Sequence, residues 1–251
     1  MEKTDIKSAN VLNQFSRTEL LIGKEGVDKL KKSKIAVFGI GGVGSFVVEG
    51  LVRSGVSNLV LIDNDTVDLT NLNRQLIATR KTIGKYKVDV MKERILEINP
   101  DAKVETYKEF FMPDSKTEII KEDLSYVVDC IDTVTAKIEI IKQCNRLSIP
   151  IISSMGTGNK LDPSKLKITD IYKTNICPLA KVMRKELRKR DISKLKVIYS
   201  EEEPITPDEK IEEICKEEGT KKKQVPGSVS FVPSVAGLMI AGEIVIDIIK
   251  L

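Results

Sequence analysis

A glycine-rich turn between an apolar run and an amphipathic run most constrains how this chain can fold. Residues 34–38 (KIAVF) predict a buried strand, and the apolar spacing of residues 43–54 predicts a helix. Gly39, Gly41 and Gly44 form the pattern G-x-G-x-x-G between them. Such glycines permit a tight turn, close approach of the backbone to a phosphate and close packing of helix on strand. The order of strand, turn and helix therefore predicts a nucleotide site, and a structural turn without a ligand is the alternative.

Strand and helix patterns alternate through the first 155 residues. Consecutive parallel strands joined by helices form right-handed crossovers, so this alternation predicts an α/β fold with a Rossmann-like, doubly wound and mainly parallel sheet. The helices are expected at 18–32, 43–54, 86–98 and 134–147, and the strands at 34–38, 58–63, 103–107, 125–132 and 150–153.

The pattern changes after about residue 160. We expect a single domain over residues 1–251, in which a smaller substrate and dimer region, 156–251, packs on a nucleotide-binding core, 1–155. The smaller region is expected to contain more exposed strands, a basic helix, a charged loop and an apolar closing helix. These are predicted at 165–172 and 196–200, at 179–190, at 201–226 and at 233–249, respectively.

The chain contains no histidine, and this absence excludes several classes of chemistry. There can be no Ser-His-Asp or Cys-His triad, no histidine general base and no histidine-ligated metal. No C-x-x-C pair is present, so a zinc ribbon is not expected. The cysteines are expected to be free thiols, and no signal-peptide pattern is present, so we expect a cytoplasmic protein. Glu243 and Asp247 lie in the apolar closing helix, so we do not expect it to span a membrane. The cysteines are Cys130, Cys144, Cys177 and Cys215.

Asp63 ends the second predicted strand, nineteen residues after Gly44. At this distance from a glycine turn, a carboxylate reaches the ribose hydroxyls of a bound nucleotide. The alternative is that Asp63 only caps the turn that follows. The glycine turn and the acid together favour nucleotide binding, but they do not distinguish NAD from ATP.

Arg74 and Lys87 favour ATP over NAD. A dehydrogenase holds its diphosphate on the first helix, whereas an enzyme that cleaves a nucleoside triphosphate must neutralise charge on the phosphoryl groups. Asp132 follows a predicted strand at the edge where parallel sheets bind ligands, and it suits Mg²⁺ held through phosphate oxygens. The alternatives are isolated surface charges for Arg74 and Lys87, and the N-cap of helix 134–147 for Asp132.

The runs GIGGVGS, LIDNDTVDLTNLNRQ, GKYKVDVMKERI, INP and VVDCID occur in this order, and together they resemble the ubiquitin-activating-enzyme-like adenylating enzymes. The resemblance implies bound ATP, with Gly41 near phosphate, Asp63 on ribose, Arg74 and Lys87 on the phosphates and Asp132 on Mg²⁺. QFSRTELLIG resembles the N-terminal segment of that family, whose arginine reaches the ATP of the partner subunit. Arg17 matches this arginine, which implies a homodimer. The expected nucleotide-site residues are Gly39, Gly41, Gly42, Gly44, Asp63, Asp65, Asn71, Arg74, Lys87 and Asp132, and Arg17, Arg74, Lys87 and Asp132 are the expected catalytic residues.

The second half resembles the tRNA threonylcarbamoyladenosine dehydratase branch of these enzymes. The likeness lies in IPIISSMGTGNKLDPSKLKITDIYKTNICPLAKVMRKELRKR, VIYSEE and PGSVSFVPSVAGLMIAGEIV. This branch is understood to cyclise a modified adenosine beside the anticodon of tRNA, with ATP activating its threonyl carboxylate. An atom of the same modified base would then attack, so no enzyme nucleophile is required. Whether a sulfur-relay protein assists stays open.

Three other functions remain as alternatives. The first is adenylation of the C-terminal glycine of a ubiquitin-like sulfur-carrier protein, against which the missing C-x-x-C pairs count. The second is an NAD-dependent dehydrogenase, against which Arg74 and Lys87 count. The third is a non-catalytic nucleotide-binding scaffold, which would not need every phosphate-contacting position to be filled.

Opposite charges are concentrated in two neighbouring segments. Residues 181–196 hold eight basic and two acidic side chains, whereas residues 201–218 hold nine acidic and two basic ones. The basic helix is the candidate surface for tRNA, and Lys221, Lys222 and Lys223 could extend it. A solvated helix partly neutralised by the acidic segment is the alternative. The candidate tRNA contacts are Lys181, Arg184, Lys185, Arg188 and Lys189.

Overall fold

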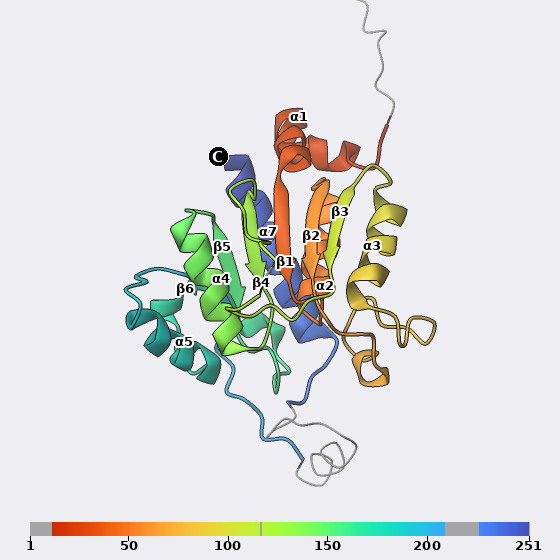
Figure 1. Ribbon diagram of the computed structural model, residues 1–251. Helices are drawn as coiled ribbons and strands as arrows, with labels where there is room; N and C mark the ends of the chain where they lie inside the picture. The colour runs from red at the N-terminus through yellow and green to blue at the C-terminus, as the bar shows by residue number, and fades with distance from the viewer. Residues whose placement is uncertain (1–11, 116, 209–225, 251) are drawn as a thin grey trace, which may run out of the picture.

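A seven-stranded sheet forms the centre of the computed structural model, which describes residues 12–115, 117–208 and 226–250 (Figure 1). The strand order is β3-β2-β1-β4-β5-β7-β6, and every neighbouring pair is parallel except β6 with β7. The strands are β1 (Lys34–Phe38), β2 (Asn58–Ile62), β3 (Lys103–Tyr107), β4 (Tyr126–Asp129), β5 (Ile151–Ser154), β6 (Leu166–Asp170) and β7 (Lys196–Ser200).

The strand order reverses between β1 and β4. From β1 the chain moves outward through β2 to β3, and it then returns to β4 on the other side of β1. Phe38 pairs with Ile62 of β2 and with Asp129 of β4, so three parallel strands end side by side. Ligands of open α/β sheets bind beyond the carboxyl ends of strands at such a switch. This arrangement places the residues that follow β1, β2 and β4 at one edge of the sheet.

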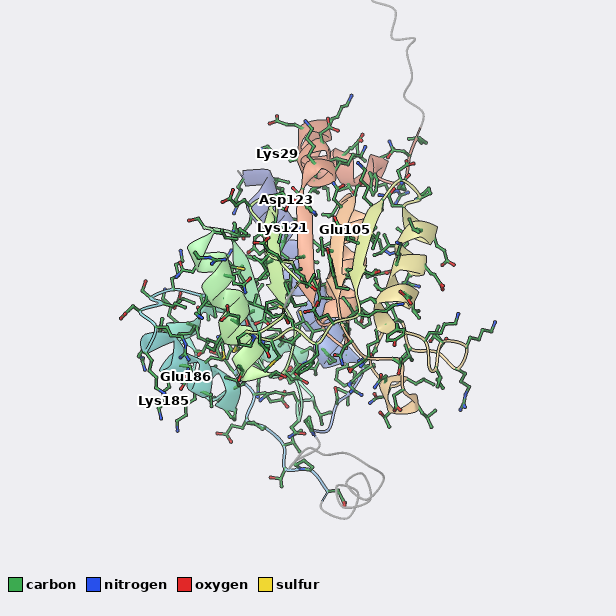
Figure 2. The ribbon with its side chains drawn as sticks, viewed as in Figure 1. Lys29, Glu105, Lys121, Asp123, Lys185 and Glu186 are labelled. Atoms are coloured by element: carbon green, nitrogen blue, oxygen red, sulfur yellow. The ribbon has the colours of Figure 1, made fainter. Side chains whose placement is uncertain are left out.

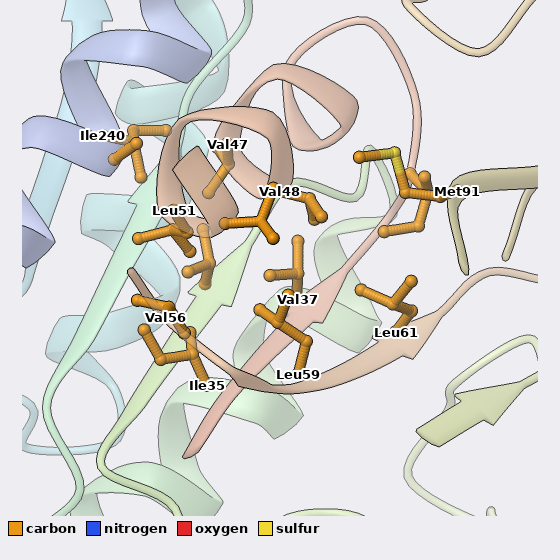
Figure 3. Packing of buried hydrophobic residues seen from close by; sticks show 14 of the residues in the cluster. Ile35, Val37, Val47, Val48, Leu51, Val56, Leu59, Leu61, Met91 and Ile240 are labelled. Carbon is orange, nitrogen blue, oxygen red and sulfur yellow. The ribbon is translucent and has the colours of Figure 1, made fainter. Parts of the chain in front are cut away.

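Helices cover both faces of the sheet. Side chains alternate between the faces of a strand, so Ile35 and Val37 pack under one layer (Figure 3). Ala36 and Phe38 pack under the other layer. Each fully buried aliphatic side chain contributes about 1.5–3 kcal/mol. The first layer contains α1 (Ser16–Lys32), α2 (Gly44–Ser54), α3 (Lys87–Ile98) and α7 (Phe231–Lys250), and the second contains α4 (Val134–Arg146) and α5 (Pro178–Arg188).

Helix α7 is long and apolar enough to cross a membrane by length and composition alone. In the structure it packs along the sheet, with Ile240 and Ile244 fully buried in the core. Its two carboxylates, Glu243 and Asp247, each lie 2.6 Å from the ammonium of Lys196 at the start of β7. Helix α7 therefore packs as a core helix of the sheet, and its two carboxylates form ion pairs with Lys196.

The predicted fold class is confirmed, and three local details differ. Gly23, at φ 70°, breaks α1, because a left-handed residue cannot continue a right-handed helix. Strand β7 is expected from the sequence to be exposed, but its last four residues are buried, because β6 and β5 pair with its two edges. The predicted strand 165–172 ends at Asp170, and residues 171–173 form a short 3-10 turn. Of the predicted loop 201–226, residues 201–208 and 226 are irregular, and the remainder lies outside the described residues.

Candidate functional site

The glycine turn joins the end of β1 to the start of α2. Gly39 has φ 87°, and a Cβ atom there would lie 2.7 Å from the carbonyl oxygen of Cys130. A Cβ atom on Gly44 would lie 1.8 Å from the carbonyl oxygen of Gly39, so both positions require glycine. At Gly41, by contrast, the nearest atom to such a Cβ is the side-chain nitrogen of Gln75, 3.8 Å away. The turn is therefore tight at its ends and open in the middle, where the first helical N–H groups can approach an anion.

Asp63 connects the turns after β1 and β2. Its Oδ2 accepts a hydrogen bond from the backbone N–H of Ile40 at 2.7 Å, and its Oδ1 accepts one from the N–H of Asp65 at 2.8 Å. Burial raises the pKa of Asp63, and the charge of Lys87 and the two backbone donors oppose that rise. Each oxygen keeps a second lone pair, which can accept a hydrogen bond from a ribose hydroxyl.

Lys87 is brought to the site by a short antiparallel bridge between Thr66 and Tyr86. Its side chain is only 7% exposed, and its ammonium lies 2.7 Å from the carboxylate of Asp65, which is 59% exposed. A buried ammonium with one exposed partner has donors left for a second anion. The structure thus places the predicted residues Asp65 and Lys87 together as an ion pair.

Arg74 follows a 3-10 turn, Leu69–Asn71, that Asn71 stabilises by accepting a hydrogen bond from the N–H of Asp68. The Arg74 guanidinium donates to the carbonyl oxygen of Thr70 at 2.9 Å, which fixes its direction. Burial lowers the pKa of Arg74, and the charge of Asp132 opposes this change. Arg74 therefore lies within electrostatic reach of the predicted Mg²⁺ residue.

Gln75 was not among the predicted site residues. It is 7% exposed, and among the described residues its Oε1 is the buried side-chain polar atom without a hydrogen-bond partner. An unsatisfied buried oxygen beside the open centre of the glycine turn is costly in the absence of a donor. Its position directly after Arg74 in a polar segment was the signal that could have identified it.

Asp132 lies in the turn between β4 and α4, and its side chain is exposed. Thr133 occupies the N-cap position of α4, and its side chain makes no capping hydrogen bond. Groups of three or more His, Cys, Asp or Glu side chains that could hold a metal ion do not occur in the part of the chain that the structure describes. Mg²⁺ commonly needs only one or two carboxylates when phosphates supply the other ligands, so the single carboxylate of Asp132 fits Mg²⁺ bound through ATP.

A model of the ThiF family matches residues 15–250. The chain belongs to the ThiF family. It is 48% identical to a tRNA threonylcarbamoyladenosine dehydratase of Bacillus subtilis, with 96% of each chain covered. It is 39% identical to the dehydratase of Escherichia coli, with 70% of this chain and 65% of that protein covered. The predicted resemblance to adenylating enzymes, and to their dehydratase branch, is confirmed.

Solved structures of Escherichia coli TcdA share the fold of this ThiF-family chain. The TcdA complex with ATP has 31% sequence identity and a TM-score of 0.83, with 94% of both chains covered. The TcdA complex with AMP has 30% identity and a TM-score of 0.83, with 97% of this chain and 98% of that chain covered.

Arg17 does not join the other predicted site residues within one ThiF-family chain. It is exposed on α1, close to Phe15, whose ring packs near Gly55 at the end of α2. Helix α2 has 11 residues, so this end lies about 16 Å from the glycine turn. Figure 1 shows α1 at the opposite end of the sheet from the switch-point turns. Arg17 therefore lies near the end of α2 that is remote from the glycine turn of its own chain.

The predicted tRNA candidates on α5 separate into two groups. Lys181, Lys185 and Arg188 are exposed along one side of the helix, and Figure 2 shows Lys185 at the edge of the molecule. Arg184 is half-buried and donates to the backbone carbonyl and hydroxyl of Thr174, and Lys189 pairs with a glutamate of the same helix at 2.7 Å. Lys221, Lys222 and Lys223 lie outside the described residues. The structure therefore leaves fewer candidates fully exposed than the sequence suggested.

The described cysteines lie in or against the core. Burial raises the pKa of Cys144 to about 12 and also raises that of Cys130, so both thiols stay protonated at neutral pH. Cys177 is 2% exposed at the N-terminus of α5. Cys215 lies outside the described residues. Oxidative or nucleophilic chemistry at Cys130 and Cys144 is therefore not favoured.

Proposed function

We propose that this chain is an ATP- and Mg²⁺-dependent enzyme that dehydrates threonylcarbamoyladenosine next to the anticodon of tRNA to its cyclic form. The observation that carries the proposal is the close sequence likeness to a Bacillus subtilis enzyme of this activity over nearly the whole of both chains. The matched stretch is 244 residues long and covers 96% of each chain. The open centre of the glycine turn and the nearby charges of Arg74 and Lys87 fit a triphosphate, and this fit supports the proposal independently.

The proposed reaction uses the substrate as its own nucleophile. ATP activates the threonyl carboxylate, and an atom of the same modified base then displaces the phosphate or nucleotide group. An intramolecular attack of this kind can have an effective concentration of about 10⁵–10⁸ M. The protein must orient the two reactants and neutralise phosphate charge, and Arg74 and Lys87 are placed to do so. A chain without histidine can supply both functions.

A homodimer is part of the proposal, because Arg17 cannot reach the site of its own chain. Leu20 and Leu21 beside it are 84% and 88% exposed, and Leu12 before the helix is 86% exposed. Three nearly fully exposed leucines around one arginine fit a surface that packs on a second copy of the chain. Mixing an Arg17→Ala variant with a Lys87→Ala variant tests this, since only a mixed dimer contains one complete site. Activity in the mixture but in neither parent is the expected result, and an inactive mixture would count against the shared site.

We also propose a cytoplasmic location, which follows from the tRNA substrate. The exposed side of α5 is the proposed contact with the tRNA backbone. Lys181, Lys185 and Arg188 lie about one turn apart, a spacing that presents positive charge along a single line. A sulfur-relay partner also remains a proposal, and nothing in the described structure selects it.

The decisive experiment incubates the purified protein with ATP, Mg²⁺ and tRNA that carries threonylcarbamoyladenosine, then digests the tRNA to nucleosides for mass spectrometry. Loss of one water from the modified nucleoside, dependent on ATP, is the expected result. An unchanged mass together with an adenylate on a sulfur-carrier protein would instead establish the alternative adenylating function. Wild-type protein without ATP is the control.

A further inference from the structure

A buried ion pair lies beneath the turn that carries Asp132. Asp129 is the last residue of β4, and Lys137 lies on the first turns of α4. Both side chains are completely buried, and the Lys137 ammonium lies 2.9 Å from Oδ2 of Asp129. The hydroxyl of Ser153, on β5, donates to the same oxygen. The four residues between Asp129 and Val134 are therefore anchored at both ends.

The remaining bonds of the pair extend to the two sides of the site. Oδ1 of Asp129 accepts a hydrogen bond from the N–H of Ile131 at 3.3 Å, which holds the turn itself. The Lys137 ammonium donates to the carbonyl oxygen of Ser154 at 2.8 Å, which holds the end of β5. One ion pair thus fixes both the turn after β4 and the segment after β5.

Those two segments border different parts of the proposed site. The turn after β4 carries Asp132, and its Cys130 carbonyl packs against Gly39 of the glycine turn. The segment after β5 reaches Asn159, which exchanges two hydrogen bonds with Gly227 before α7. The neighbouring Ser228 accepts a hydrogen bond from the side chain of Asn73, next to Arg74. The first segment therefore borders the nucleotide, and the second belongs to the C-terminal region that closes the same edge of the sheet.

Stability alone is a poor reason for such a pair. Removing two charges from water costs several kcal/mol per ion, and well-packed apolar replacements are often neutral or stabilising. Here each polar group is satisfied, because the ammonium has three acceptors and the carboxylate has three donors. A network of this kind specifies geometry more than it adds free energy.

We propose that Lys137 and Asp129 are positioning residues, which set the place of Asp132 relative to the glycine turn and to the segment after β5. The inference rests on the proposed function for its turnover assay, but its metal-dependence assay does not require that function. Neither residue needs to touch a substrate.

The test uses the variant D129N/K137M, which removes both charges and keeps similar side-chain volumes. Turnover, KM for ATP, thermal unfolding and binding of a fluorescent ATP analogue over a Mg²⁺ titration are measured. A misplacement of about 1 Å costs about 10²-fold in rate, so turnover is expected to fall on that scale while KM for ATP changes less than about threefold. The Mg²⁺ concentration for half-maximal binding of the analogue is expected to rise.

The matched control is Glu49→Gln, which alters a buried carboxylate of α2 that is bonded to two arginines and not to the turn after β4. It should lower the unfolding temperature without changing turnover per folded molecule. Ser153→Ala, which deletes only one hydroxyl, tests the same inference if the double variant does not fold, and a smaller fall in turnover with unchanged folding is expected. Wild-type turnover and wild-type Mg²⁺ dependence in either variant would overturn the proposal. If wild-type protein forms no cyclic nucleoside, the proposed function fails, and the Mg²⁺ titration still decides the role of the pair.

Discussion

Two groups of positive side chains differ in how the structure holds them. Lys87 and Arg74, near the glycine turn, are buried or half-buried, and each has a fixed partner, Asp65 or the carbonyl of Thr70. Lys181 and Lys185 on α5 are exposed. A short phosphate chain must be met by charges already in place, whereas the backbone of a nucleic acid is attracted by the density of charge over a surface. The difference suits Lys87 and Arg74 to binding ATP phosphates in a fixed geometry, and it suits the exposed lysines of α5 to attracting the tRNA backbone.

The largest expected effect concerns Lys87. Lys87→Ala should lower turnover by on the order of 10²–10³-fold, because it removes a preorganised donor to phosphate. The unfolding temperature should fall modestly. Asp65, which is 59% exposed, can be hydrated, but the buried Asp63 loses the charge that opposes the rise of its pKa. Asp65→Asn is the matched variant, and it should retain most activity because the ammonium remains. Equal losses in both variants, measured as kcat and KM for ATP, would mean that the ion pair rather than the ammonium is needed.

The glycine turn offers the next test, because its two ends and its centre differ. Gly44→Ala should destabilise the fold by about 3 kcal/mol or more, since the added Cβ would overlap the carbonyl oxygen of Gly39. Gly41→Ala should leave the free energy of unfolding nearly unchanged and weaken ATP binding instead. Urea unfolding and ATP titration of both variants check this. A stable Gly44→Ala protein, or a Gly41→Ala protein with full ATP affinity, would contradict the assignment of these glycines.

Charge reversal on α5 should have a smaller effect, limited to tRNA. K181E/K185E is expected to weaken tRNA binding about tenfold and to lower the slope of log affinity against log salt by about 1.4–1.8, because each of the two lost phosphate contacts contributes about 0.7–0.9. Turnover at saturating tRNA should persist. K103E/K121E makes the same change in net charge elsewhere, and Figure 2 shows Lys121 well away from Lys185. Identical salt slopes for the two double variants would remove α5 from the proposed tRNA surface.

Local sequence patterns were sufficient for the parts of the site built within one strand–turn–helix unit. The glycine turn, Asp63 and Asp132 could be placed because each follows a recognisable buried strand, and parallel strands end at one edge. The order of the motifs along the chain is also sufficient to identify the family.

Features that depend on distant partners could not be predicted in this way. Lys137 has the pattern of an ordinary helical lysine, and only the pairing of β4 with β5 brings Asp129 and Ser153 to it. Strand β7 is short and begins with a lysine, so its burial depends on β6 turning back to cover its edge. Gln75 follows Arg74 in the polar segment, but its burial and its unpartnered oxygen depend on how that segment packs near the glycine turn.

The smallest expected effect concerns Glu49, a buried carboxylate of α2 that is paired with two arginines and is not among the site residues. Burial tends to raise the pKa of Glu49, but hydrogen bonds from Arg94 and Arg53 outweigh it and hold this pKa below its usual value of 4.5. A carboxyl group with a lower pKa in the folded state stabilises the protein above its unfolded pKa, and this contribution disappears as the pH falls. Glu49→Gln should therefore cost about 1 kcal/mol at neutral pH, because both arginines are partly exposed, and the difference from wild type should close below about pH 4.5. Urea unfolding across this pH range measures the gap, and a gap independent of pH would mean that packing rather than charge accounts for it.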